Sequence, residues 1–321
     1  MGGIRRLLFI CAMALAWTTA AAAQTYPTKP VRIIVPFPAG QATDILARVI
    51  GEQLAKTLGQ PVVIENKPGA GGTIGATLAA KSEPDGHTLL MVTISTHGIG
   101  PNLYAKLPYD PLRDFAPISN VGLTPQTLMA SKKTDMTSLK DVIAKAKAGE
   151  VDFGSSGNGS ASHLAAEMLK ATAGLKLRHI PYKGNADAFV ALARGDIAVL
   201  FDAIPGALPQ ITGGEVKGIA IASLTRSPFL PDLPTLAEQG LPGFEAVGWI
   251  GLAAPAGTPE PILSRLNAEV RKILDEPAVQ ERLKSLAFVS AGGTREEFTT
   301  FIAAEIAKWG KVTKDAGIKI E

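Results

Sequence analysis

Cysteine is nearly absent from this chain of 321 residues, and the single one, Cys11, lies in an N-terminal segment that we predict is removed. A mature chain without thiols has no disulfides and no cysteine chemistry, so its hydrophobic core alone must hold the fold. Aromatic residues make up only 6% of the chain, and no run of like charges stands out. A nucleic-acid groove needs a basic stripe with interleaved stacking rings. The composition therefore argues against nucleic acid as a partner.

The first 23 residues have the features of an export signal. Arg5 and Arg6 precede an apolar run from Leu7 to Trp17, and small residues end at Ala23, before Gln24. This order is typical of a cleaved signal peptide, and we predict cleavage near Ala23/Gln24. A retained anchor is the alternative. The apolar run is shorter than the ~18 residues that span a bilayer, and no later stretch reaches that length.

Removal of this segment leaves nearly balanced charge. Two of the 32 basic residues go with it, which leaves 30 against 29 acidic residues. The remaining length is sufficient to bury a sizeable core and favours two domains over one.

Short β-rich runs alternate with amphipathic helices in the first part of the chain. We predict strands at 31–35, 62–64 and 89–92, a helix that starts near Thr43 or Asp44, and a second helix at 70–81. The first helix has Leu46, Ile50, Leu54 and Leu58 on one face. Strands that alternate with helices indicate a mainly parallel sheet covered by helices, an α/β fold.

The pattern resumes after a proline-rich passage. There we predict helices at 139–148, 162–172 and 186–194, and strands at 151–153, 179–182, 197–201 and 219–222. A second proline-rich passage follows, and two C-terminal helices carry apolar faces around 262–273 and 298–309. Two such blocks suggest two lobes with more than one connection, the chain returning to the first lobe at its end. Two sequential domains are an equal alternative at this point.

The stretch SSGNGSASH, residues 155–163, follows a predicted strand and precedes a helix. A glycine-rich loop there leaves backbone N–H groups to point at one spot, with the positive end of the helix behind them. Serine hydroxyls add uncharged donors, so the loop suits a carboxylate. A solvated turn with a serine N-cap is the alternative.

Spacing argues against catalysis by this stretch. A nucleophile elbow needs G-x-S-x-G, and the segment that begins at Gly154 has Asn158 in the fifth position. The dinucleotide fingerprint G-x-G-x-x-G fails too, because Ser162 stands where Gly or Ala is needed. His163 is a base only if a serine is presented to it, so we predict no catalytic residue.

Two further glycine-rich loops follow predicted strands, at 35–44 and 66–76. In parallel α/β folds ligands sit at the carboxyl ends of strands, so all three loops are expected to face one crevice. Asp202 ends another strand there and could meet a ligand amine or hydroxyl; a capping role is the alternative. Tyr182 and Lys183 could reach the same cleft. The four histidines have no metal-ligand spacing, and we predict neither metal nor cofactor.

Many short motifs, in order along nearly the whole mature chain, resemble one family. They include Val35-Pro36-Phe37, Leu58-Gly59-Gln60-Pro61, Glu65-Asn66-Lys67-Pro68-Gly69-Ala70-Gly71-Gly72, Pro84-Asp85-Gly86, Pro181-Tyr182-Lys183-Gly184 and Ala254-Pro255-Ala256-Gly257-Thr258-Pro259, besides the 155–163 stretch. The chain resembles the Bug-type substrate-binding proteins of tripartite tricarboxylate transporters, which are periplasmic solute receptors.

The resemblance implies a two-lobed, type 2 periplasmic-binding-protein clamp. Its first lobe is expected at 24–120 and 226–321, its second at 121–225, with the ligand cleft between them. It further implies a monomeric receptor, not an enzyme, that closes on a small carboxylate, dicarboxylates included, and delivers it to membrane transporter subunits. A receptor that feeds a signalling partner and an enzyme acting on a small carboxylate are the alternatives.

Carried over residue by residue, the resemblance completes the predicted ligand-binding set. The set is Phe37, Pro38, Ala39, Gly40, Gln41, Gly69, Ala70, Gly71, Gly72, Ser95, Ser155, Ser156, Gly157, Asn158, Gly159, Ser160, His163, Tyr182, Lys183 and Asp202. Gln41 departs from the glycine that the family often has there, and its long amide can add a hydrogen bond or fill space.

Overall fold

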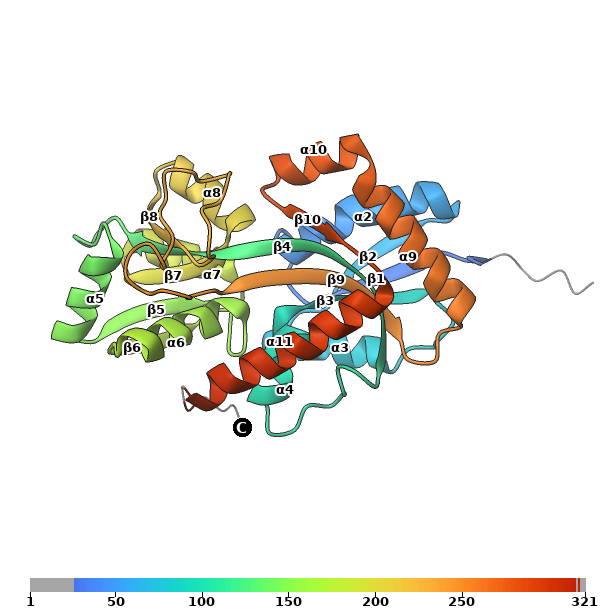
Figure 1. The fold of residues 1–321 in the computed structure, drawn as a ribbon, viewed down its shortest axis with the longest axis horizontal. Helices are drawn as coiled ribbons and strands as arrows, with labels where there is room; N and C mark the ends of the chain where they lie inside the picture. Colours follow the sequence, from blue (N-terminus) through green and yellow to red (C-terminus); the bar gives the residue numbers. More distant parts are fainter. Residues whose placement is uncertain (1–25, 316, 318–321) are drawn as a thin grey trace, which may run out of the picture.

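The computed structural model describes residues 26–315 and 317; the predicted export signal, residues 1–23, lies outside the described residues. A sheet of ten strands runs through the molecule in the order β2-β1-β3-β9-β4-β7-β5-β6, and β8 and β10 pair with β4. Figure 1 shows two lobes side by side, one at each end of the long strands β4 and β9. The α/β clamp predicted for the chain is thus its fold.

The first lobe is built around parallel strands β1 to β3. Its elements are β1 (Val31–Val35), α2 (Ala42–Leu58), β2 (Val62–Asn66), a 3-10 turn η1 (Ala70–Gly72), α3 (Thr73–Ala80), β3 (Thr88–Thr93), a π turn η2 (Ile94–Ile99) and α4 (Gly100–Leu103). Helix α2 buries Leu46, Ile50, Leu54 and Leu58, the face that the spacing predicts. The second helix begins at Thr73 rather than at residue 70, because Ala70, Gly71 and Gly72 all have positive φ.

The second lobe repeats the alternation. Its elements are α5 (Leu139–Ala148), β5 (Val151–Ser155), α6 (Ala161–Ala173), β6 (Leu177–Pro181), α7 (Asn185–Arg194), β7 (Val199–Ala203), α8 (Ile204–Thr212) and β8 (Val216–Ile221). Strand β5 pairs in parallel with both β6 and β7. Successive β7 residues face opposite sides of the sheet: Leu200 packs in the cluster that contains α7, and Phe201 in the cluster that contains α6.

Two long strands connect the lobes, and the sequence did not predict them. These are β4 (Phe115–Ser131) and β9 (Val247–Pro255), which pair antiparallel along most of their length. Strand β4 contains Pro117 and Pro125, and its register shifts just after Pro117. Proline lacks the N–H that a strand ladder uses, so this passage has the composition of a loop although it forms a strand.

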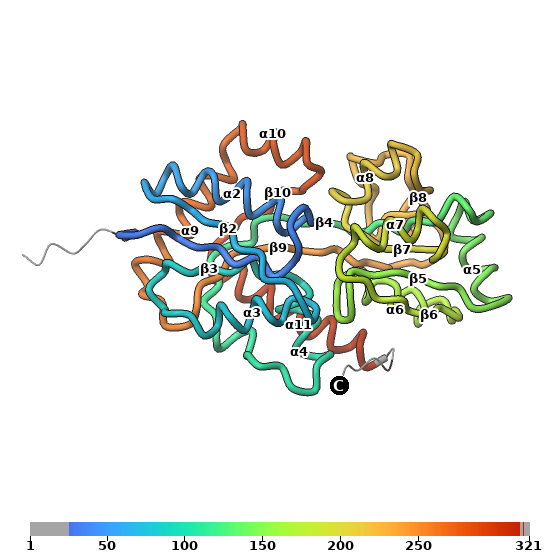
Figure 2. Tube along the Cα trace, turned by 180° about the vertical axis from the view of Figure 1, so that it is seen from behind, coloured from blue at the N-terminus to red at the C-terminus, as the bar shows by residue number. Residues whose placement is uncertain are grey.

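The C-terminal elements return to the first lobe. They are α9 (Glu260–Asp275), α10 (Pro277–Ser285), β10 (Val289–Gly292) and α11 (Arg295–Asp315). In Figures 1 and 2, α2, α9 and α10 lie on one side of the sheet, and α3, α4 and α11 on the other. One apolar cluster on the α11 side runs through both lobes, whereas the first-lobe cluster that contains α2 is separate from the second-lobe cluster that contains α7. The exact lobe boundaries at residues 120 and 226 stay a prediction.

Within the part of the chain that the structure describes, no helix combines the length and the apolarity needed to cross a membrane.

Candidate functional site

A cavity of about 830 Å³ lies between the lobes. Loops that follow β1 and β3 line it from the first lobe, and loops that follow β5, β6 and β7 line it from the second. The lining includes ten residues of the predicted set: Phe37, Pro38, Ala39, Gly40, Gln41, Ser95, Ser156, Ser160, Lys183 and Asp202. The carboxyl ends of the parallel strands therefore meet at one crevice, as in other α/β folds.

A buried carboxylate shapes the first-strand loop. Asp44, 2% exposed, accepts a hydrogen bond from the Gly40 N–H at 2.9 Å, and its other oxygen accepts from Asn66 Nδ2 at 2.9 Å. Burial alone would raise the pKa of Asp44, but its hydrogen bonds with Arg48, Gly40 and Asn66 outweigh burial and lower it. Neither Thr43 nor Asp44 is the N-cap, because helix α2 already begins at Ala42. Asp44 instead fixes the loop from inside the first turn.

Three hydroxyls form a connected row at the start of α6. Ser162 Oγ lies 3.2 Å from Ser156 Oγ and 3.0 Å from Ser160 Oγ, and it accepts a hydrogen bond from the Ser156 N–H. All three serines line the cavity. Ser160 is also the N-cap, since its Oγ accepts from the His163 N–H at 3.2 Å. The row brings uncharged donors and the positive helix end to the cavity wall.

Most backbone N–H groups of this loop are used within the protein, unlike the expectation from the sequence. Gly157 donates to Ser155 Oγ, Gly159 donates to His163 Nδ1, and Ala161 donates to Ser95 Oγ of the first lobe. The Ser160 N–H donates to the Gly157 carbonyl. Side-chain hydroxyls, rather than a backbone nest, are thus the main donors that the loop presents to the cavity.

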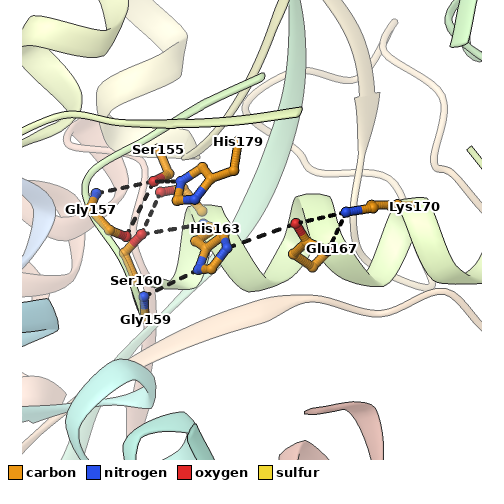
Figure 3. Close-up of polar contacts among 9 residues, drawn as sticks. Ser155, Gly157, Gly159, Ser160, His163, Glu167, Lys170 and His179 are labelled. Atoms are coloured by element: carbon orange, nitrogen blue, oxygen red, sulfur yellow. Dashed lines mark hydrogen bonds and ion pairs between the residues drawn. The ribbon is translucent and has the colours of Figure 1, made fainter. Parts of the chain in front are cut away.

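Two histidines support the loop from behind (Figure 3). The rings of His163 and His179 stack with centroids 3.9 Å apart, and Phe153 stacks on His179 at 4.8 Å. Burial lowers the pKa of His163 to about 3 and that of His179 to about 4. Because His163 Nδ1 accepts from Gly159, the ring is neutral in this arrangement.

The one close Ser–His pair does not face the cavity. Ser155 Oγ lies 2.6 Å from His179 Nε2, but Ser155 is fully buried and is not among the lining residues. Within residues 26–315, no hydrogen bond joins the imidazole ring of His163 to the Ser156 or Ser160 hydroxyl; of His163, only the backbone N–H donates to Ser160 Oγ. Among the described residues, the hydroxyls of the cavity wall therefore have no histidine ring within hydrogen-bonding distance, which a serine nucleophile would need as its base.

Ten predicted residues lie outside the lining: Gly69, Ala70, Gly71, Gly72, Ser155, Gly157, Asn158, Gly159, His163 and Tyr182. The 69–72 loop instead approaches the 155–160 loop at the rim. Tyr104 Oη lies 3.0 Å from the Ala70 carbonyl oxygen and 3.2 Å from that of Asn158. A Cβ on Gly71 would come within 2.8 Å of the Asn158 carbonyl oxygen. These glycines permit close approach of the two lobes.

Gln41 and Gly184 form a second contact between the lobes. A Cβ built on Gly184 would lie 2.7 Å from Gln41 Nε2, so the Gln41 amide reaches across to the loop before α7. Both residues line the cavity. The Gln41 amide therefore occupies space between the two lobes at the cavity wall.

Asp202 is the last residue but one of β7 and is 7% exposed. Its Oδ1 accepts hydrogen bonds from Asn185 Nδ2 and from the Ala203 N–H, the latter at 2.8 Å. Burial raises the pKa of Asp202 to about 7, and these two donors offset only part of that effect.

Sequence reasoning missed the floor of the cavity. Thr124 and Gln126 from β4, and Gly248 and Trp249 from β9, line it together with Asn185 from α7. A Cβ on Gly248 would meet Thr124 Oγ1 at 2.7 Å, so this glycine lets β9 lie close to β4. Buried polar side chains in a strand are the one signal that could have identified Thr124 and Gln126.

No group of three or more His, Cys, Asp or Glu within residues 26–315 has the geometry of a metal site.

Residues 46–318 match the family model described as tripartite tricarboxylate transporter family receptor. Protein BugT of Bordetella pertussis is 38% identical over 98% of this chain and 99% of its own length. An R. palustris protein solved with adipate is 35% identical, with a TM-score of 0.89 over 92% of this chain and 99% of that one. MatC from Rhodopseudomonas palustris, solved with bound malate, is 37% identical, with a TM-score of 0.85 over 89% and 99%.

Proposed function

The chain belongs to the tripartite tricarboxylate transporter receptor family, a family of solute receptors rather than enzymes, and we propose that it captures a small carboxylate between its lobes. The observation that carries this proposal is the cavity of about 830 Å³ with the serine row of α6 in its wall. Uncharged hydroxyls and a helix N-terminus suit an anion, and exclusion of water on closure strengthens each hydrogen bond. The adipate and malate in the two similar structures support the same ligand class.

Export and delivery complete the proposal. Cleavage near Ala23/Gln24 would release the mature receptor into the periplasm as a monomer. The closed form would then present a surface formed by both lobes to the membrane subunits of a tripartite transporter. The contacts at Tyr104 and Gln41 support this view, since both join the two lobes beside the cavity.

Calorimetry on the mature protein, freed of co-purified ligand by unfolding and refolding, tests the proposal. We expect saturable binding of at least one small carboxylate, which is recovered chemically unchanged. At about 100 times its Kd such a ligand stabilises the protein by about 2.7 kcal/mol, so a thermal-shift screen identifies it first. Binding confined to uncharged solutes, or chemical turnover of a bound acid, would contradict the proposal.

A further inference from the structure

The cavity has two polar walls, one with hydroxyl groups at the start of α6 and one with hydrogen-bond acceptors at the end of β7. The α6 wall presents hydroxyl groups from Ser156, Ser160 and Ser162. The wall at the end of β7 presents acceptors instead. There Asn185 Oδ1 is buried without a hydrogen-bond partner. Asp202 Oδ2 likewise receives no hydrogen bond from any residue in 26–315, since both donors of this side chain serve Oδ1.

Hydrogen-bond acceptors that lack a donor within the protein restrict which ligands can fill the cavity. A buried polar atom that loses water without gaining a partner costs free energy, and more so when it is charged. Two such oxygens on neighbouring side chains call for N–H or O–H groups from the ligand. A second carboxylate, with no hydrogen to offer, would leave both oxygens unpaired.

Charge leads to the same conclusion. Four charged residues line the cavity: Lys183, Asp187, Asp202 and Glu215. Lys183, Asp187 and Glu215 are exposed, so Asp202 is the buried one. No arginine is among the lining residues, and Lys183 is the one basic side chain. A ligand with two carboxylates would therefore bring a second negative charge near a buried acid that has no buried cation beside it.

We infer that Asp202 and Asn185 select the second functional group of the ligand: a carboxylate at one end, and an amino or hydroxyl group at the other. This inference rests on the proposed function and makes it specific. The donor end would bind Asp202 Oδ2 and Asn185 Oδ1, and the carboxylate would bind the serine row. Dicarboxylates are then poor ligands wherever Asp202 is ionised.

The experiment compares matched acids by calorimetry at pH 8. The experiment uses four carbon frameworks, those of butanoate, pentanoate, hexanoate and benzoate. On each framework it compares the plain acid with the acids that carry a hydroxyl, an amino or a second carboxyl group at the far end. Asp202→Asn removes the charge and keeps the shape, and Asn185→Leu removes the amide. Asp275→Asn, an exposed acid on α9, is the control with the same charge change.

We expect a hydroxy or amino acid to bind the native protein about tenfold or more tightly than the plain acid and the diacid of the same framework. Asp202→Asn should abolish the difference, whereas Asp275→Asn should leave it intact. If both the hydroxy acid and the amino acid bind more tightly than the plain acid, their relative affinities show which donor fits Asp202 and Asn185 better. A diacid that binds as well as the hydroxy and amino acids, or a ratio that Asp202→Asn leaves unchanged, overturns the inference while carboxylate capture stands. No binding of any acid overturns the proposed function, and this inference with it.

The pH dependence gives a second readout. Burial raises the pKa of Asp202 to about 7. Below that pH the protonated side chain can donate a hydrogen bond to a second carboxylate, and above it the ionised side chain repels that carboxylate. Diacid affinity should fall by up to about tenfold per pH unit above pH 7 in the native protein and stay level in Asp202→Asn. A diacid that binds the native protein as tightly as the hydroxy and amino acids above pH 7 overturns the inference.

Discussion

The indoles of Trp249 and Trp309 donate to the same carboxylate oxygen, Glu305 Oε2, at 3.0 Å each. Trp249 lies on β9 in the cavity floor, and Trp309 lies on α11 in the core. Glu305 is 7% exposed, and Lys308 Nζ lies 3.5 Å from its Oε1. Helix α11 is thus tied through one carboxylate to a residue of the cavity floor. The C-terminal helix therefore supports the cleft floor as well as the first lobe.

This relationship makes tryptophan fluorescence a probe of the cleft. The chain has three tryptophans, and Trp17 falls in the predicted export signal. Trp309→Phe should therefore leave Trp249 as the one emitter of the mature protein, at a stability cost of about 1–3 kcal/mol. We expect its emission to shift when a ligand binds, measured by titration. Trp249→Phe is the matched control, and an equal shift in that variant would contradict the assignment of Trp249 to the floor.

The serine row should contribute to affinity unequally. Ser156→Ala removes one hydroxyl donor and should weaken ligand binding by about 1–3 kcal/mol, with little change in unfolding temperature. Ser160→Ala also removes the N-cap of α6, so it should lower the free energy of unfolding by about 0.5–2 kcal/mol besides weakening binding. Ser285→Ala, at the end of α10, is the control. Calorimetry and thermal unfolding measure the two effects, and unchanged affinity in both cavity variants would remove the row from the site.

Two buried histidines, His97 and His163, and the half-buried His179 should make the protein sensitive to mild acid. Burial lowers the pKa of His97 to about 3, that of His163 to about 3 and that of His179 to about 4. Unfolded histidine titrates near 6.5, so between about pH 6.5 and pH 4 the unfolded chain binds more protons. The histidine contribution to stability is complete above pH 6.5 and falls as the pH is lowered through this window. Asp202, whose pKa is raised to about 7, has the opposite sign and offsets part of the loss.

Urea unfolding at pH 8, 6 and 5 measures this effect. His97 is fully buried between Tyr109 and Phe115, and its Nε2 has no partner. His97→Phe should therefore reduce the pH slope by up to about 1.4 kcal/mol per pH unit below pH 6.5. An unchanged slope in this variant would show that folding does not lower the pKa of His97.

Local patterns predicted the elements of each lobe, and contacts between distant segments account for what was missed. The Leu46–Leu58 spacing identified α2, and Phe298, Ile302 and Trp309 identified α11, because helix periodicity is a local property. Strand β4 was not predicted, because its prolines are typical of a loop although the strand pairs with neighbours on both sides. The cavity loops after β1 and β5 could be predicted from their position after strands. Asn185 and Trp249 could not, because only the tertiary fold brings α7 and β9 to those loops.

The rim contact at Tyr104 should stabilise the closed form whatever the ligand. Its hydroxyl lies 3.0 Å from the Ala70 carbonyl oxygen of the first lobe and 3.2 Å from the Asn158 carbonyl oxygen of the second, and Tyr104 does not line the cavity. Tyr104→Phe removes this link without touching the ligand. We therefore expect it to weaken every ligand by the same factor, about 0.5–1.5 kcal/mol.

Calorimetry with two ligands of different length tests this expectation, and small-angle scattering should show a larger fraction of open molecules at equal ligand. Tyr26→Phe is the matched control, since its hydroxyl donates to the Gly86 carbonyl at 2.7 Å, outside the cavity lining. The control should lower stability and leave affinity alone, because that bond lies within the first lobe. A Tyr104→Phe effect that differs between the two ligands would mean that Tyr104 acts on the ligand itself. Equal weakening would make the 69–72 loop a closing contact, which explains why its glycines lie at the rim rather than in the cavity.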